Sequence, residues 1–317
     1  MPLKIFIFSF LLDILLGDPE NFPHPVRLIG KAIEKVNRFL FIFDFKTKAF
    51  INGIILFIII VSGTSAGIIF LLILSNYLGS TFFLLINIYL LYSAIALKDL
   101  KDKTFRIYKA LSINNIELAR YYLSHVVGRD TKNLSEHEIV RGTVETIAEG
   151  FTDGVVSPMF YFFFGGNILV WIYKAINTLD SMVGYNFPPY TYYGRFSAKI
   201  DDMFNFIPAR LSVVFILFYA LIGKKDFKNG IGVFKKYRKN HPSPNGGNPE
   251  SAMAGILGIR LGGINYYKGH KSERGYIGIP KKPLKKEVIK EAIDVLYGAS
   301  FLLFVIEGLF LWIVKGF

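Results

Sequence analysis

Cysteine is absent from this sequence, and charged residues are few. The 317 residues include no cysteine, which excludes disulfides, thiolate metal sites and a cysteine nucleophile. Only 19% of the residues are charged, compared with about 25% in an average soluble domain. The 49 residues between Lys48 and Lys98 contain no Asp, Glu, Lys, Arg or His. Together these absences exclude a simple cytosolic enzyme, a disordered chain and a secreted disulfide scaffold.

Apolar segments of membrane-spanning length fill the chain instead. A spanning helix needs about 20 apolar residues, so the uncharged run has room for two, separated by a polar break at 75–80. Pro158 and the pair Gly165-Gly166 predict that a third segment is broken or re-entrant. The N-terminal stretch is predicted to stay uncleaved, because no small-residue cleavage site follows it. The predicted membrane segments are at about 3–16, 51–74, 81–97, 155–173, 208–222 and 296–314.

Basic residues predict the orientation of the chain. Segments 18–50, 98–154 and 223–296 hold 31 of the 37 Lys and Arg residues, and such segments face the cytoplasm. We therefore predict an all-α, polytopic integral membrane protein of the cell membrane, with about four to six membrane-embedded helices and helical or loop segments in the cytoplasm. Residues 1–317 are predicted to form one membrane-embedded domain.

A first polar segment follows the N-terminal apolar stretch. Proline on either side of His24 favours an extended chain there, and Arg27 follows within one helical turn. Two interpretations stay open. One is a turn that leads into a basic helix start. The other is an anion or phosphate contact made by Arg27.

A row of carboxylates is predicted on a helix that begins at Ser135. Ser135 and Glu138 have the spacing of a capping box. Further along, Glu145, Glu149 and Asp153 recur every four residues, so they share one helical face. This row runs into an apolar segment, where carboxylates are costly. It is predicted either as a Mg²⁺ or Mg-nucleotide site or as a solvated face.

A third polar segment combines acidic, amide and basic residues. Lys174, Asn177 and Asp180 share one predicted helical face, and Asp201 with Asp202 lies on another. Paired carboxylates beside amides are typical of magnesium coordination, and basic groups here suit phosphates. Buried ion pairing between helices is the structural alternative.

The fourth polar segment is a loop rich in Pro, Gly and Asn. It begins at His241 and leads into the small-residue stretch 251–255, so it is predicted to feed a helix N-terminus. It does not have the spacing of a Walker A motif. Taken alone, a Gly-rich loop of this kind is more often an ordinary turn than a binding site.

These segments, in this order, resemble the CobD/CbiB family of cobalamin biosynthesis, the adenosylcobinamide-phosphate synthases. The resemblance runs from Gly17 to about Gly263, which is nearly the whole chain. The family usually has Asn where this chain has Gly150. The motifs that carry the resemblance are PHPVRLIG at 23–30, VGRDT at 127–131, ETIAEGFTDG at 145–154, YKAINTLDSMVGY at 173–185, DDMFNFIPARL at 201–211 and HPSPNGGNPESAMAGILGIRLGG at 241–263.

The resemblance implies an integral membrane ligase. Such an enzyme joins a carboxylate of adenosylcobyric acid to the amine of (R)-1-amino-2-propanol phosphate, or of the free aminoalcohol, with ATP and Mg²⁺ as the implied energy source. The substrates and the lipid bilayer are then its partners. A homo-oligomer, or contact with other corrinoid-pathway enzymes, is compatible with the sequence.

The resemblance and the residue chemistry together give candidate roles. The catalytic candidates, with a histidine as base, are His24, His241, Lys174 and Asp180. Substrate or phosphate contacts are predicted for Arg27, Arg129, Asn177, Arg210, Ser243, Asn245 and Arg260. Metal ligands are predicted at Glu145, Glu149, Asp153, Asp201 and Asp202.

Orientation and function conflict in one region. Counting basic residues places 174–206 outside, whereas ATP and corrinoid intermediates are cytoplasmic. Two solutions are open: the flanking apolar segments are re-entrant or tilted, or the motifs line a cavity at membrane depth that opens inward. In either case the site is predicted to face the cytoplasm.

Two other membrane functions remain as alternatives. A transporter also has intramembrane carboxylates and broken helices. A Mg-dependent membrane phospho-alcohol transferase also uses aspartate clusters, but the second half of its motif is absent at the needed spacing. Nucleic-acid binding is not expected from the net charge of +13, because basic residues facing the membrane surface are normal in polytopic proteins.

Overall fold

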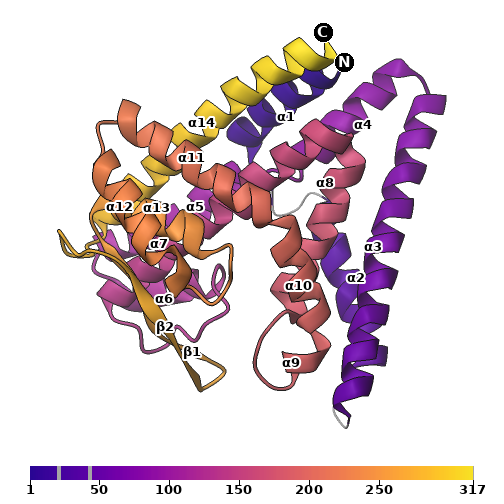
Figure 1. Cartoon of the computed structure of the whole chain (residues 1–317). Helices are drawn as coiled ribbons and strands as arrows, with labels where there is room; N and C mark the ends of the chain where they lie inside the picture. Colours follow the sequence, from indigo (N-terminus) through magenta and orange to yellow (C-terminus); the bar gives the residue numbers. More distant parts are fainter. Residues whose placement is uncertain (20–22, 42–44, 317) are drawn as a thin grey trace. The chain divides into compact units, whose positions relative to one another are not determined.

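The computed structural model describes residues 1–19, 23–41 and 45–316. Helices dominate the chain, and a two-stranded hairpin is the only sheet among the described residues (Figure 1). Four helical stretches are long and apolar enough to cross a membrane, or five if the bent pair α10 (Arg195–Phe204) and α11 (Phe206–Ile222) counts as one broken span. The predicted all-α polytopic class is therefore confirmed.

The chain divides into two compact units. Unit 1 comprises residues 1–96, 157–205 and 307–317, and unit 2 comprises residues 97–156 and 206–306. The helices of unit 1 are α1 (Pro2–Leu16), α2 (Pro25–Leu40), α3 (Lys46–Tyr77), α4 (Ser80–Tyr92), α8 (Ser157–Val183), α9 (Tyr190–Tyr193) and α10 (Arg195–Phe204).

Unit 2 carries the remaining elements. They are α5 (Leu97–Ser112), α6 (Ile116–Ser124), α7 (Glu136–Phe151), the π-helical turn η1 (Thr152–Val156), α11 (Phe206–Ile222), α12 (Phe227–Tyr237), the 3-10 turn η2 (Arg238–Asn240), α13 (Gly247–Leu257), β1 (Arg260–Tyr267), β2 (His270–Gly278) and α14 (Glu287–Lys315), whose last turns belong to unit 1. Strands β1 and β2 pair antiparallel. The sequence patterns did not predict this hairpin.

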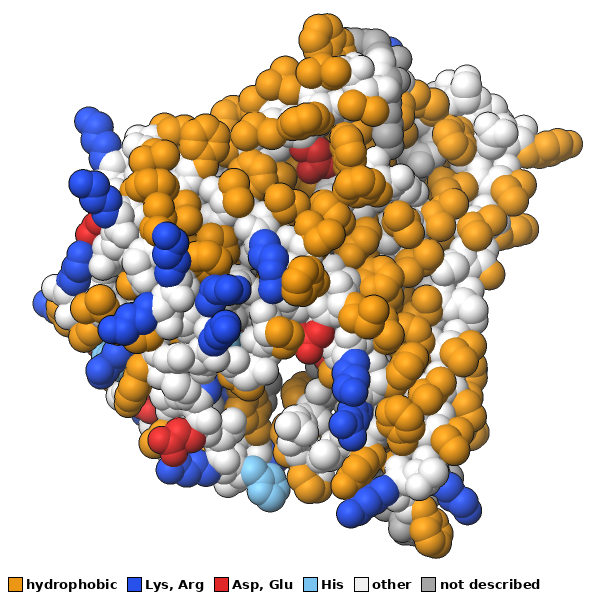
Figure 2. All heavy atoms as spheres, viewed as in Figure 1, with side chains coloured by type: hydrophobic (Ala, Val, Ile, Leu, Met, Phe, Trp, Pro, Cys, Tyr) orange, Lys and Arg blue, Asp and Glu red, His pale blue; other side chains and the backbone are white. Residues whose placement is uncertain are grey.

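Helix α3 has the exposure expected of a lipid-facing helix. Its large apolar side chains, such as Ile58, Phe70 and Ile73, are exposed by 57–66%, and Figure 2 shows hydrophobic side chains along this helix. A break at Leu78-Gly79 separates α3 from α4. The predicted pair of apolar helices with a polar break is therefore confirmed.

The predicted break in the third apolar segment is also present. Helix α8 is interrupted at Gly165 and Gly166, and Gly166 has a φ of 60°, a conformation that favours glycine.

The predicted capping box at Ser135 is confirmed as well, because Ser135 and Glu138 exchange side-chain and backbone hydrogen bonds at the start of α7. Helix α7 thereby holds its carboxylates in a fixed register.

Helix α13 is the centre of unit 2. All eleven of its residues are buried, and it packs against α7, α11, α12 and the hairpin. Its small residues make this possible: a Cβ on Gly255 would lie 2.7 Å from the Cα of Gly230 on α12. The polar residues at its N-terminus are therefore held by neighbours on several sides.

Candidate functional site

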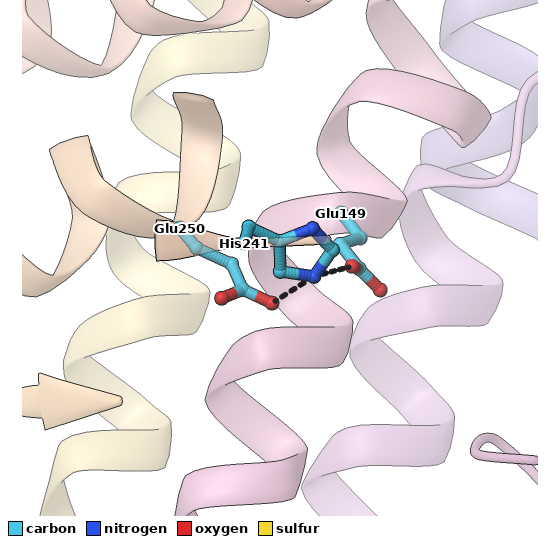
Figure 3. Close-up of side chains that lie close together, drawn as sticks. All are labelled: Glu149, His241 and Glu250. Carbon is cyan, nitrogen blue, oxygen red and sulfur yellow. Dashed lines mark ion pairs between the residues drawn. The ribbon is translucent and has the colours of Figure 1, made fainter. Parts of the chain in front are cut away.

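A cluster of ionisable side chains in unit 2 joins α7, the loop before α13, α13 itself and β2. Glu149 comes from α7, His241 from the loop and Glu250 from α13. Figure 3 shows the three side chains converging. The Nε2 atom of His241 lies 3.4 Å from Oε1 of Glu149 and 3.7 Å from Oε1 of Glu250. About ninety residues lie between α7 and the loop in the sequence, so the three side chains meet only because the chain folds.

Two glycines leave room for the imidazole ring of His241. A Cβ on Gly246 would lie 2.7 Å from Cε1 of His241 and 2.9 Å from Oε1 of Glu149. A Cβ on Gly247 would lie 2.1 Å from the carbonyl oxygen of Arg238. The Gly-Gly pair at the start of α13 is therefore required by close packing, because a larger residue would push the ring out of the cluster.

The exposure of the three side chains differs sharply. The side chain of Glu250 is 0% exposed and that of His241 7%, whereas that of Glu149 is 44% exposed. One oxygen of Glu250, Oε2, is buried without a hydrogen-bond partner. The cluster therefore has a buried acidic end at Glu250 and an accessible end at Glu149.

Glu145, one turn before Glu149, binds arginines. It forms buried ion pairs with Arg129 and, at 2.9 Å, with Arg274, and it accepts a 2.9 Å hydrogen bond from the amide of Gly262. Arg274 lies on β2 and also reaches Oε1 of Glu250 at 3.4 Å. Glu145 therefore ties the hairpin to α7 and positions Arg274 beside the cluster.

A further arginine closes the same network. Arg141 on α7 donates to the carbonyl oxygens of Gly262 and Ile264 and to the side-chain oxygen of Asn265, which also accepts from Arg129. The side chains of Arg129, Arg141 and Asn265 are buried. Because buried charges are stable only when they are paired and hydrogen-bonded, the hairpin depends on these contacts for its position.

Burial and neighbouring charges alter the acidity of the cluster. Burial raises the pKa of Glu250 to about 7, although Arg274 and His241 oppose the increase. Burial lowers the pKa of His241, but the carboxylates of Glu250 and Glu149 outweigh it, and the net pKa is raised. The pKa of Arg274 is raised as well, because three carboxylates overcome its burial. Glu250 therefore titrates near neutral pH, and His241 holds its proton more tightly than an unperturbed imidazole does.

The loop before α13 holds two of the predicted phosphate contacts of unit 2, Ser243 and Asn245. Ser243 accepts hydrogen bonds from the amides of Asn245 and Gly246, which closes the turn. Arg210 donates a 3.3 Å hydrogen bond to the side-chain oxygen of Asn245. Its guanidinium also stacks on Phe206, and the distance from the guanidinium carbon to the ring centroid is 3.5 Å. Arg260 is exposed and lies over Tyr276.

Unit 1 has a separate polar cluster around Asp201. Both oxygens of this buried carboxylate accept amide hydrogen bonds, from Asn177 at 3.3 Å and from Asn205 at 3.0 Å. Asn205 in turn accepts from Ser157 and Tyr173. Two amides therefore satisfy the carboxylate between α8 and α10, and two hydroxyls satisfy the oxygen of one of these amides, as buried polar groups require.

Other predicted residues of unit 1 surround this region. Lys174 and Asp180 lie on α8, Lys174 being buried, and Asp202 follows Asp201 on α10. Asp202 also lines a cavity of about 430 Å³ together with Tyr185, Tyr192, Arg195 and Lys199. Two basic residues one helical turn apart, Arg195 and Lys199, therefore line the same cavity as the carboxylate of Asp202.

The first polar segment also belongs to unit 1. Nε2 of His24 lies 3.4 Å from Oδ1 of Asp18, and His24 is the N-cap residue of α2 with extended backbone, as its flanking prolines predict. Arg27 donates a 2.7 Å hydrogen bond to the carbonyl oxygen of Pro19. The arginine thus contacts the preceding turn.

The residues predicted from the sequence therefore fall into two groups. Glu145, Glu149 and His241 share one network in unit 2, and Asp153 lies in the π-helical turn that follows α7, half-buried. A π turn has a longer repeat than an α-helix, so it shifts Asp153 off the regular row of carboxylates. Sequence reasoning missed Glu250 and Arg274. Glu250 stands in a motif already singled out, whereas the Arg274 segment shows no pattern.

Comparisons with known proteins agree on one family. A sequence model described as "CobD/Cbib protein" matches residues 6–296. The chain is 41% identical over 300 residues to "Cobalamin biosynthesis protein CobD" of Clostridium perfringens, covering 93% of this chain and 94% of the relative. It is 42% identical to the protein of the same name from Clostridium tetani, covering 96% of each, and 40% identical to that from Listeria monocytogenes serotype 4b, covering 96% of this chain and 97% of the relative. No solved structure matches the chain.

Proposed function

The chain belongs to the CobD/CbiB family, and from that premise we propose that it is an ATP-dependent amide ligase of cobalamin biosynthesis. The proposed substrates are adenosylcobyric acid and (R)-1-amino-2-propanol phosphate, or aminopropanol itself, and the product is adenosylcobinamide phosphate. Membership of this family supports a role in cobalamin biosynthesis. The observation that carries the reaction type is the unit 2 cluster, which combines carboxylates, guanidiniums and an imidazole at one helix N-terminus.

Amide formation from a carboxylate needs activation first. In the proposed sequence, a carboxylate oxygen of the corrinoid attacks the γ-phosphorus of ATP, which releases ADP and leaves an acyl phosphate. The amine nitrogen then attacks the acyl carbon, phosphate leaves and the nitrogen gives its proton to a base. Guanidiniums stabilise the charge that develops on the transferring phosphoryl group. Arg274 and Arg210 in unit 2 are suited to this role, since each lies at the loop before α13.

Mg²⁺ is expected with ATP, and part of the predicted ligand set suits it. The carboxylate of Glu149 is 44% exposed, so it can meet the cation that a nucleotide brings. Such a cation neutralises phosphate charge. Glu145 is engaged by two arginines and an amide, so we propose that it positions Arg129 and Arg274. The metal roles of Glu145, Asp153, Asp201 and Asp202 stay predictions that no observation tests.

The base is proposed among the two histidines predicted from the sequence. His24 in unit 1 lies against Asp18, and His241 in unit 2 lies against Glu149 and Glu250. A carboxylate beside an imidazole fixes its orientation and stabilises its protonated form, which is the usual arrangement for a histidine base. Lys174 and Asp180 remain catalytic predictions within unit 1.

A direct reconstitution tests the proposal. Purified protein in detergent is incubated with adenosylcobyric acid, aminopropanol phosphate and Mg-ATP, and the corrinoids are analysed by mass spectrometry. The expected product is heavier than adenosylcobyric acid by the aminoalcohol phosphate minus one water, and it forms only with ATP. Corrinoid flux into proteoliposomes without any such product would instead identify a transporter.

A further inference from the structure

The centre of the Glu149–His241–Glu250 cluster has the dimensions of a metal site. The three ligand atoms lie within 4.8 Å of one another. Ligands about 2.1 Å from a tetrahedral metal ion are about 3.4 Å apart. The separations from Nε2 of His241 to the two carboxylate oxygens are 3.4 and 3.7 Å. Small side-chain movements would therefore bring all three atoms onto one cation.

The hydrogen bonds of His241 leave the lone pair of Nε2 directed at this centre. Nη1 of Arg274 lies at Nε2, and a guanidinium only donates, so Nε2 accepts. The other ring nitrogen, Nδ1, is held by the backbone of Ser243, 3.0 Å from its amide nitrogen and 3.3 Å from its carbonyl oxygen. In a metal-binding histidine, likewise, one ring nitrogen faces the ion while a hydrogen-bond partner fixes the other.

Glu250 supplies an independent observation. Its side chain is 0% exposed, its Oε1 faces His241, and its Oε2 is buried without a hydrogen-bond partner. A carboxylate oxygen in that position costs free energy unless a cation or a donor reaches it. Arg274 only partly meets this need, at 3.4 Å from Oε1. The more exposed side chain of Glu149 marks the side from which an ion enters.

We infer that Glu149, His241 and Glu250 bind one divalent transition-metal cation, of which Mn²⁺ is the probe. Two carboxylates suit Mg²⁺ and Mn²⁺, whereas an imidazole suits transition metals. A ligand set of two carboxylates and one imidazole therefore favours transition-metal ions over Mg²⁺. This cation is additional to the Mg²⁺ that accompanies ATP, and assigning Glu149 to it withdraws Glu149 as a ligand of that Mg²⁺. The inference rests on the proposed function only for the role of the ion; its binding does not depend on the ligase reaction.

Arg274 then has two positions. In the structure its Nη1 lies at Nε2 of His241, and its Nη2 donates to Glu145 at 2.9 Å. A bound cation takes the place of Nη1, while the bond to Glu145 keeps the side chain nearby. The carboxylates of Glu145, Glu149 and Glu250 already balance Arg129, Arg141 and Arg274. A bound dication therefore adds a net positive charge that attracts an anionic group such as a phosphate.

Assigning His241 to the metal removes it from the candidate bases. Its Nε2 lone pair holds the cation, and Nδ1 is bonded to the loop backbone. Of the two predicted bases, His24 then remains.

Mn²⁺ binding to the purified full-length protein tests the site without any activity assay. Free Mn²⁺ is followed by electron paramagnetic resonance during a titration, and one bound ion per chain is expected. Loss of a supporting partner of a metal ligand lowers affinity about 10–100-fold, so loss of a ligand in Glu250→Gln or His241→Ala is expected to cost at least that much. Zn²⁺ is expected to displace the Mn²⁺, and a hundredfold excess of Mg²⁺ is not.

The controls separate binding from folding. Glu273→Gln removes a 68% exposed carboxylate next to Arg274 and is expected to bind Mn²⁺ as the unmodified protein does. Glu250→Gln keeps the shape of the side chain and removes a buried charge, and circular dichroism checks its fold. Arg274→Gln removes the competing cation and is expected to bind Mn²⁺ more tightly.

Any one of three results would overturn the inference. The first is absence of stoichiometric Mn²⁺ binding, the second is undiminished binding by Glu250→Gln, and the third is displacement of Mn²⁺ by Mg²⁺ as readily as by Zn²⁺. The ligase proposal fails separately: a protein that binds Mn²⁺ as expected but forms no corrinoid amide keeps the metal site and loses the reaction.

Discussion

Arg274 donates a hydrogen bond to Nε2 of His241 from a strand that begins 29 residues after the histidine. This contact places a donor against Nε2, because arginine has no acceptor. It also makes the charged hairpin part of the cluster. The side chains on α7 that hold the hairpin are therefore as important to the site as the side chains that face its centre.

Glu145 is expected to be the residue on which this arrangement depends most. Glu145→Gln removes the paired carboxylate of the buried Arg129 and one of the two carboxylates that pair with Arg274, and breaking a buried ion pair costs about 3–5 kcal/mol. Unfolding in detergent, followed by circular dichroism against denaturant, measures the loss.

A matched substitution at an exposed pair is the control. Glu117 pairs with Arg120 at 2.5 Å, but its side chain is 80% exposed. Glu117→Gln is expected to change the free energy of unfolding by no more than about 1 kcal/mol, because exposed ion pairs contribute little. Equal effects of the two substitutions would contradict the structural role given to Glu145.

Gly246 is expected to be essential for geometry rather than for backbone conformation. Its φ is −55°, so alanine is conformationally allowed there, but the added Cβ would lie 2.7 Å from the ring of His241. Displacing a catalytic or binding group by about 1 Å can lower activity about 100-fold. We expect Gly246→Ala to lose amide synthesis to about this extent while the protein still folds.

Gly232→Ala on α12 is the comparison for that substitution. A Cβ there has nothing within 4 Å, and alanine is a better helix former than glycine. The variant is expected to retain full activity in the corrinoid assay and to be at least as stable. A fully active Gly246→Ala protein would mean that the position of His241 does not matter for the reaction.

Asp153 provides a test of the predicted row of metal ligands. If it binds the magnesium that accompanies ATP, Asp153→Asn raises the magnesium concentration required for half-maximal amide formation, since a neutral amide is a weaker ligand than a carboxylate. The measurement is the initial rate against magnesium at fixed ATP. An unchanged curve at limiting magnesium would remove Asp153 from the metal ligands, and the π-helical turn would then be the physical reason.

Local patterns predicted much of the helical architecture. The apolar pair before and after Gly79, the capping box at Ser135 and the break at Gly165-Gly166 all depend on neighbouring residues, so the sequence alone was sufficient. The hairpin of β1 and β2 was missed, because its burial comes from contacts with α7 and α13 rather than from a regular alternation along its strands.

The candidate site shows the same limit. Glu149 was found because it recurs on one helical face, and His241 because it begins a Pro- and Gly-rich loop. Glu250 is the first acidic residue of a helix, where a carboxylate usually interacts with the helix dipole, and nothing local shows that it is fully buried. Arg274 depends on a contact with Glu145 across 129 residues, which no local pattern predicts.

The side of the membrane on which residues 174–206 lie is the last prediction. Because the chain has no cysteine, single cysteines introduced at chosen positions react with a membrane-impermeant maleimide in intact cells only if they lie outside. Tyr77→Cys, at the 87% exposed end of α3, is the expected outside marker. Lys271→Cys, in the basic segment 223–296, is the expected inside marker and should react only after permeabilisation. Tyr192→Cys should behave like Lys271→Cys, because the proposed substrates are cytoplasmic. Labelling of Tyr192→Cys in intact cells would place its cavity outside and contradict a role for that cavity in a reaction that uses cytoplasmic ATP.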